Sequence, residues 1–237
     1  MSAKVPDSHP GGGSVESFLD HLSSVPQRRS DGALGRLMFA MDATASRQPT
    51  WDRAVSIQAE MFKAAEQVGG LEIQLVFYRG FGEFKASPWL ADPTRLAHMM
   101  SKVSCLAGGT QIRKVLRHAV NQAEAGSVNA LVFVGDCLEE DVDALGDVAG
   151  KLGVLGVPAF LFREGADPVA AFGFDQVAKL TGGASLEFDP NSPRMLADLL
   201  KAVAIFAAGG HRALDDLAKV EGGEMLRLTR SFGGSRD

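Results

Sequence analysis

The chain has 237 residues, of which 46% are hydrophobic and 22% are charged. This composition is typical of a soluble globular protein with one α/β domain and short extensions, or with two small domains. The formal net charge is −5 and the acidic and basic residues are well mixed, which argues against a nucleic-acid-binding protein with a basic stripe.

The N-terminal part is poor in apolar residues. Residues 1–14 are rich in Pro, Gly and Ser, and we expect them to be disordered. The following SVESFLDHL favours a short helix with Ser14 as its N-cap, and residues 26–35 favour a linker. The N-terminus has no apolar core of a signal peptide, and no later stretch is long and uncharged enough to span a bilayer. We therefore expect a cytoplasmic protein that does not bind membranes.

From Arg36 onward, short apolar runs alternate with amphipathic stretches. The apolar runs predict strands at residues 37–41, 71–78, 83–86, 128–134, 157–162 and 184–188. Helical periodicity predicts helices at residues 51–68, after Asp92-Pro93, after Thr110, and at 139–152, 175–180 and 193–208. The sequence RGFG before strand 83–86 predicts a hairpin turn. This alternation predicts an α/β fold with a doubly wound, mostly parallel sheet and helices on both faces.

The same pattern predicts three parts of the chain. Residues 1–34 would be a flexible segment with room for a short helix. Residues 35–208 would be the α/β domain. Residues 209–237 would be a C-terminal extension, in which residues 224–232 fit a strand or a helix.

Polar side chains follow two of the predicted strands. In LMFAMDATAS the first strand is followed by Asp42, Thr44 and Ser46, and the fourth strand ends at Gly-Asp with Asp136. A third polar residue, Thr110, follows a Gly-Gly pair. Carboxylate and hydroxyl oxygens are hard donors, which suit Mg²⁺ or Mn²⁺ rather than zinc or copper. The alternative interpretation of these residues is ordinary loop and helix capping.

These motifs resemble the metal-ion-dependent adhesion site of von Willebrand factor A (VWA) domains. That family carries D-x-S-x-S, then a distant Thr, then a distant Asp, and DATAS, GGT and GD match in that order within residues 35–208. Thr44 stands where the family has its first Ser, which keeps the hydroxyl. The resemblance implies a six-stranded sheet with one antiparallel edge strand.

The resemblance also implies a ligand set and a class of partner. Mg²⁺ (or Mn²⁺) would be held by Asp42, Thr44, Ser46, Thr110 and Asp136. The hydroxyls would bind directly and the aspartates directly or through water. A partner protein would then supply an Asp or Glu to the ion. Bacterial intracellular members imply partners such as AAA+ ATPases or complex-assembly factors, by family analogy.

The position of these residues supports the resemblance. Ligands of doubly wound sheets bind at the carboxyl ends of the strands, where the strand order reverses. If the first and fourth strands are central neighbours, Asp42 and Asp136 meet at that point. For Arg47, directly after Ser46, two hypotheses remain: repulsion of the ion, or a second contact to the partner's carboxylate.

Other residues near these motifs have ordinary interpretations. Glu139, Glu140 and Asp141 fit the first turn of the helix predicted at 139–152, where negative charge is favourable. Cys105 and Cys137 have no zinc-ligand spacing and no disulfide framework. They fit small buried residues better than a redox switch.

The sequence contains no phosphate-binding loop, dinucleotide fingerprint or nucleophile elbow, and we expect that the protein is not an enzyme. The strongest enzyme alternative is a haloacid-dehalogenase-like phosphotransferase, which places a nucleophilic Asp after the first strand. That family needs a second Asp two residues later as a general acid, where this chain has Thr44. A further alternative is a VWA-like scaffold that binds partners without a metal ion.

Overall fold

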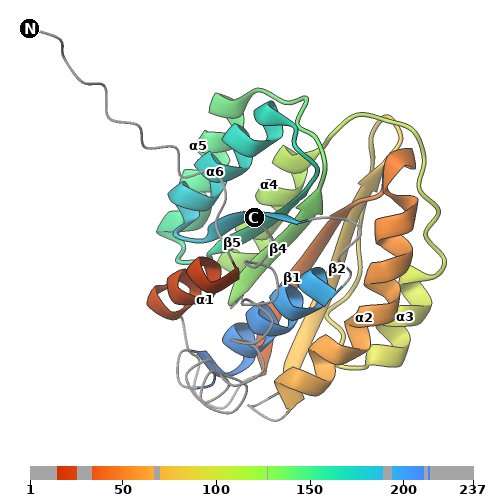
Figure 1. The fold of residues 1–237 in the computed structure, drawn as a ribbon, viewed down its shortest axis with the longest axis vertical. Coiled ribbons are helices and arrows are strands. Elements are labelled where there is room, and N and C mark those ends of the chain that lie inside the picture. Colours follow the sequence, from red (N-terminus) through yellow and green to blue (C-terminus); the bar gives the residue numbers. More distant parts are fainter. Residues whose placement is uncertain are drawn as a thin grey trace, which may run out of the picture.

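The computed structural model describes residues 15–25, 34–66, 70–126, 128–188, 194–210 and 213. Its centre is a sheet of six strands in the order β3-β2-β1-β4-β5-β6 (Figure 1). All neighbours pair in parallel except β3, which is antiparallel to β2 at one edge. The strands are β1 (Gly35–Asp42), β2 (Leu71–Arg79), β3 (Glu83–Ala86), β4 (Ala130–Gly135), β5 (Ala159–Glu164) and β6 (Ala184–Phe188). The predicted doubly wound sheet with an antiparallel edge strand is confirmed.

Helices cover both faces of this sheet (Figure 1). One face carries α1 (Val15–Ser24), α2 (Gln48–Glu66), α3 (Pro93–Met100) and the helical residues 194–210. The other face carries α4 (Ile112–Ala125), α5 (Val142–Val154) and α6 (Pro168–Thr181). A short 3₁₀ turn, η1 (Ala45–Arg47), joins β1 to α2. Within the described ranges, every helix is too short or too polar to traverse a lipid bilayer.

β1 is one of the two central strands and is buried on both of its faces. Leu37, Phe39 and Met41 belong to the core under α2, whereas Met38 and Ala40 belong to the core under α4 to α6. A strand covered on both faces is apolar at every position rather than at alternate positions. This explains why the run before Asp42 is continuously apolar.

α1 packs on the sheet through its own apolar face. Phe18 and Leu22 are buried, and the Phe18 ring makes edge-on contacts with the rings of Phe160 and Phe162 on β5. The predicted N-cap at Ser14, residues 26–33 of the predicted linker, and the predictions for residues 1–14 and 224–232 lie outside the described residues.

Three helices begin at other residues than the sequence pattern predicted, and the first of them is α2, which begins at Gln48 rather than at residue 51. α6 begins at Pro168 rather than near residue 175, because the Asp167 carboxylate caps it by accepting hydrogen bonds from two backbone N–H groups at 2.8 Å. Gly173 interrupts the apolar periodicity there, and a Cβ at that position would lie 2.1 Å from the Leu138 side chain. α5 begins at Val142 with Asp141 as its N-cap, three residues after the predicted start.

The connections of β1 create the point where ligands bind in such folds. The chain leaves β1 through α2 to β2 on one side, and β4 pairs with β1 on the other side. The strand order therefore reverses between β1 and β4, and the carboxyl ends of both strands open toward the same crevice.

Candidate metal centre

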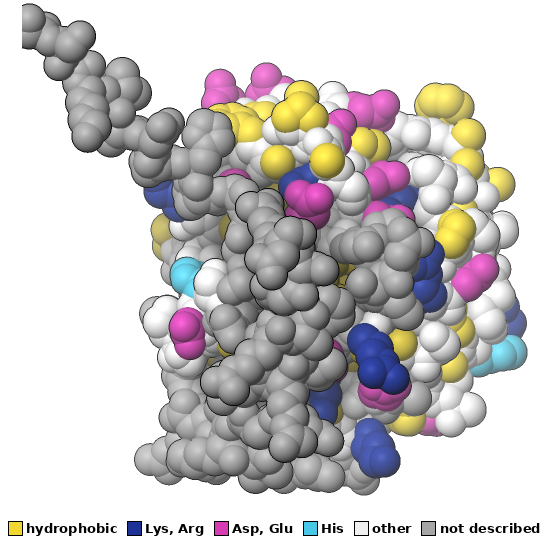
Figure 2. All heavy atoms as spheres, viewed as in Figure 1, with side chains coloured by type: hydrophobic (Ala, Val, Ile, Leu, Met, Phe, Trp, Pro, Cys, Tyr) yellow, Lys and Arg dark blue, Asp and Glu magenta, His cyan; other side chains and the backbone are white. Residues whose placement is uncertain are grey.

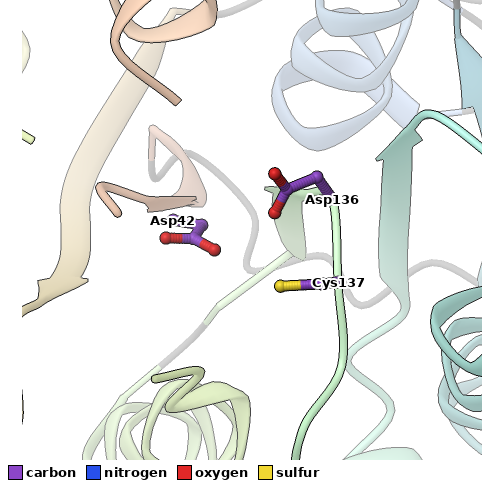
Figure 3. Close-up of side chains that lie close together, drawn as sticks. All are labelled: Asp42, Asp136 and Cys137. Carbon is purple, nitrogen blue, oxygen red and sulfur yellow. The ribbon is translucent and has the colours of Figure 1, made fainter. Parts of the chain in front are cut away.

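Two of the predicted ligands meet at this crevice. Asp42 is the last residue of β1, and Asp136 follows directly after β4. Oxygens of the two carboxyl groups lie within 4.8 Å of one another, and both side chains point into the same space (Figure 3). The two carboxyl groups therefore lie at the same end of the sheet. This is the arrangement expected if the first and fourth strands are neighbours, and β1 and β4 are paired.

The Asp42 carboxyl group is fully buried and only half satisfied. Its Oδ1 accepts a hydrogen bond from the Thr44 backbone N–H at 2.7 Å, whereas Oδ2 has no partner in the described structure. Burial, with a smaller contribution from the charge of Asp136, raises the pKa of Asp42 to about 6 against the opposing effects of Thr44 and Arg47. A buried carboxylate with a free oxygen is a suitable ligand for a cation.

Asp136 is in a similar position and is oriented by Ser46. The Ser46 hydroxyl donates to Asp136 Oδ2 at 2.9 Å, which brings the DATAS loop against the loop after β4. The other oxygen, Oδ1, is buried without a hydrogen-bond partner among the described residues. Each of the two carboxyl groups therefore keeps one free oxygen in the described structure, and the Ser46 hydroxyl lies next to Asp136.

Thr110 is attached to the Asp136 loop through Glu139. The Thr110 backbone N–H donates to Glu139 Oε2, and the Thr110 hydroxyl accepts from the Glu139 backbone N–H, both at 3.0 Å. Thr110 is not the N-cap of α4, since the helix begins at Ile112 with Gln111 at the cap position. The structure brings Asp42, Thr44, Ser46 and Asp136 together, and it holds Thr110 next to the Asp136 loop.

The loop that carries Thr110 is packed against the Asp42 loop. The Leu106 backbone N–H donates to the Ala43 carbonyl oxygen at 3.0 Å, and the Gly80 N–H donates to the Leu106 carbonyl oxygen at 3.4 Å. A Cβ at Gly108 would lie 2.0 Å from the Gly80 carbonyl oxygen, so only glycine fits there. The first glycine of the Gly-Gly pair before Thr110 is therefore a packing requirement of this end of the molecule.

The acidic residues after Asp136 act on a different helix from the one predicted. Glu140 accepts hydrogen bonds from the backbone N–H groups of Ile112 and Arg113, the latter at 3.0 Å. It therefore caps α4, whereas the sequence predicted that Glu139 and Glu140 lie in the first turn of α5. The reason is that α4 has no capping side chain of its own, and a carboxylate from the next loop satisfies its free N–H groups.

Arg47 is buried against Glu164 rather than facing an incoming ligand. Its side chain is 1% exposed and forms an ion pair with Glu164 at the end of β5, which also accepts a hydrogen bond from Thr50. Arg47 Nε and Nη2 have no partner in the described structure. A charge paired in this way repels an ion at Asp42 less than a free one would, and its burial separates it from a partner's carboxylate.

Two residues with no predicted role in the site also contribute to this cluster. Tyr78 pairs with Asp42 in the sheet, and burial, followed by the charge of Asp42, raises the pKa of its hydroxyl well above the ordinary value. The Cys137 Sγ lies within 4.8 Å of the Asp42 and Asp136 oxygens, and burial, followed by the charge of Asp136, raises its pKa to about 12. For Tyr78 the available signal was its position opposite Asp42 on the neighbouring strand.

No protein-family model and no curated protein sequence matches this chain. Among solved structures, the chain is similar to a von Willebrand factor type A protein from Catenulispora acidiphila, with a TM-score of 0.58 and 14% identity over 73% of this chain and 43% of that chain. It is also similar to the VWA domain of SpRpn10, with a TM-score of 0.54 and 14% identity over 71% and 94% of the two chains. A third similar structure is the conserved hypothetical protein BatB from Bacteroides thetaiotaomicron, with a TM-score of 0.54 and 13% identity over 72% and 98%. At these identities the likeness shows the fold alone, which is VWA-like.

The buried Asp42 predicts a pH dependence of stability in the metal-free protein. Its pKa rises from an ordinary value of 3.8 to about 6 on folding. Between these two pH values the Asp42 carboxyl group is therefore more fully protonated in the folded state than in the unfolded state. The free energy of unfolding should therefore fall as pH rises through this window, by about 3 kcal/mol from this group. Urea denaturation in the presence of chelator, from about pH 4 to pH 7, measures this change in the free energy of unfolding.

Asp42→Asn provides the comparison, because the amide has no charge to bury. We expect the difference in unfolding free energy between wild type and Asp42→Asn to shift in favour of the variant as pH rises toward 7. Parallel pH profiles for the two proteins would contradict the described burial of the Asp42 carboxylate.

Proposed function

We propose that the chain is a metal-dependent protein-binding module in which Mg²⁺ (or Mn²⁺) at Asp42 and Asp136 accepts a carboxylate from a partner protein. The observation that carries this proposal is the pair of buried carboxylate oxygens, Asp42 Oδ2 and Asp136 Oδ1, that have no hydrogen-bond partner in the described structure. The VWA-like fold supports an interaction scaffold, and the order of the DATAS, GGT and GD motifs supports the metal.

Each predicted ligand has a role in this proposal. Asp42 and Asp136 would hold the ion directly or through water, and the Ser46 hydroxyl, which already orients Asp136, would bind beside them. Thr44 would contribute its hydroxyl, and its backbone N–H fixes the Asp42 carboxyl group. Thr110 would contribute its hydroxyl from the loop that Glu139 holds in place.

Exposed apolar side chains next to the site support a protein as the partner. Phe81, at the tip of the β2–β3 hairpin, is 98% exposed, and Leu106 is 46% exposed. The Leu106 backbone bonds both to Ala43 and to Gly80 beside Phe81, so both residues border the site. Figure 2 shows exposed hydrophobic side chains at the upper right, over the end of β2 and the start of α2. Large apolar side chains that are exposed to solvent are typical of protein-binding surfaces.

We propose a partner surface that combines an Asp or Glu with apolar residues. The carboxylate would complete the metal shell, and the apolar residues would cover Phe81 and Leu106. AAA+ ATPases and complex-assembly factors are the classes of partner that the VWA resemblance implies. A metal-free scaffold would bind its partner equally in chelator, and a haloacid-dehalogenase-like phosphotransferase would release phosphate from small phosphate esters.

Metal binding should stabilise the protein through Asp42. At Mg²⁺ concentrations a hundredfold above the dissociation constant we expect about 2.7 kcal/mol of stabilisation, or roughly 5–10 °C in melting temperature for a chain of this size. Asp42→Ala should abolish the Mg²⁺ response, because it removes a buried ligand. Thermal melts with Mg²⁺ and with chelator measure both.

Asp167→Ala is the matched control. It removes a carboxylate that caps α6 near the same end of the sheet, and it should lower stability by about 1 kcal/mol while the Mg²⁺ response stays. A wild-type melting temperature that is the same in Mg²⁺ and chelator would contradict the proposed function, and so would an unchanged response in Asp42→Ala.

Phe81 and Leu106, the exposed apolar residues beside the site, should contribute to binding of the partner and not to binding of the metal. Phe81→Ser should reduce the amount of partner that the immobilised chain captures from lysate in Mg²⁺, with the Mg²⁺ shift in melting temperature unchanged. Val154→Ser is the control, because Val154 is 89% exposed at the end of α5, which leads into the amino end of β5 and so lies away from the carboxyl ends of the strands. Equal capture by both variants and by the wild type would contradict a contribution of Phe81 to partner binding. Equal capture in Mg²⁺ and in chelator would favour the metal-free scaffold.

A further inference from the structure

A sulfur atom belongs to the same donor cluster as the two aspartates. Asp42, Asp136 and Cys137 each offer one ligand atom, and these atoms all lie within 4.8 Å of one another. Figure 3 shows the Cys137 Sγ and both carboxyl groups directed into one space. The sequence predicted oxygen donors only and treated Cys137 as a small buried residue.

Independent observations indicate that a cation fits this space. Asp42 is fully buried, and its Oδ2 has no hydrogen-bond partner among the described residues. Asp136 Oδ1 is likewise buried and unpartnered. The Cys137 Sγ therefore lies within 4.8 Å of oxygens from two carboxyl groups, each of which keeps one oxygen without a partner in the described structure.

We infer that Cys137 is a ligand for a thiophilic divalent cation of the zinc class, bound where the proposed function places Mg²⁺. Mg²⁺ takes oxygen ligands and does not use thiols, whereas Zn²⁺, Co²⁺ and Cd²⁺ bind sulfur and carboxylate together. On coordination the metal replaces the thiol proton, which leaves to solvent. Three protein donors would leave a fourth position open for water or for a partner's carboxylate.

The distances are compatible with such an ion after a small movement. In tetrahedral coordination, zinc–sulfur and zinc–oxygen bonds of about 2.3 Å and 2.1 Å place two ligands of one ion roughly 3.6 Å apart. The donors lie within 4.8 Å of one another before any ion draws them together. Binding of the ion would therefore draw the three side chains together by up to roughly 1.2 Å.

The inference shares its ion position with the proposed function and adds a consequence for metal choice. A site with a sulfur ligand binds zinc-class ions more tightly than Mg²⁺. Such ions would therefore compete with Mg²⁺ at this position even at lower concentration, and Cys137 would be the residue that sets this preference.

Co²⁺ titration of the full chain, kept reduced and stripped with chelator, tests the inference. A cobalt–thiolate bond gives a charge-transfer band in the near ultraviolet. We expect this band in the wild type, saturating at one ion per chain, and its loss in Cys137→Ser with at least tenfold weaker Co²⁺ binding. Cys105→Ser is the matched control, because Cys105 is also half-buried but lies outside the donor cluster, and it should keep the band.

The outcomes separate this inference from the proposed function. Absence of the band in the wild type, its persistence in Cys137→Ser, or equal Co²⁺ affinity in the wild type and Cys137→Ser would overturn the role of Cys137. Mg²⁺ stabilisation, measured in the same two proteins, should be the same in both. Loss of the Mg²⁺ response with an intact cobalt band would instead contradict the proposed Mg²⁺ function and leave the Cys137 ligand supported.

Discussion

The site depends on two carboxyl groups that the fold brings together, largely buried, at the ends of neighbouring parallel strands. Asp42 ends β1 and Asp136 follows β4, and each keeps one oxygen without a hydrogen-bond partner in the described structure. Burying two like charges is unfavourable unless a proton or a cation compensates them. The raised pKa of Asp42 and the proposed ion are therefore two consequences of one constraint.

The surrounding contacts orient these carboxyl groups and leave most of their charge uncompensated. Thr44 and Ser46 each donate one hydrogen bond, to Asp42 and Asp136 respectively. Arg47, a buried cation whose charge acts on Asp42, is paired with Glu164. Glu139 accepts a hydrogen bond from the Thr110 backbone N–H. The loops that carry Asp42, Thr110 and Asp136 are therefore connected by hydrogen bonds. A rigid, partly uncompensated cluster of this kind suits an ion that keeps a position for a ligand from outside the chain.

The fold and the pair of aspartates were predictable from the sequence because their signals are local. A continuous apolar run indicates a strand buried on both faces, and an Asp directly after such a run lies at the carboxyl end of the sheet. Contacts between distant loops have no such signal. Glu140 was assigned to the helix that follows it in sequence, but it caps α4, and Cys137 was judged by spacing alone, although the fold places it beside Asp42. The burial of Arg47 against Glu164 was likewise unpredictable, since the partner lies 117 residues away.

The position of the ion is the central claim, and anomalous diffraction tests it most directly. Crystals of the chain grown with Mn²⁺ should give an anomalous difference peak between the Asp42 and Asp136 carboxyl groups, with Asp42 Oδ2 and Asp136 Oδ1 as its nearest protein oxygens or joined to it by water. A map from such crystals with no peak between these carboxyl groups would contradict the account.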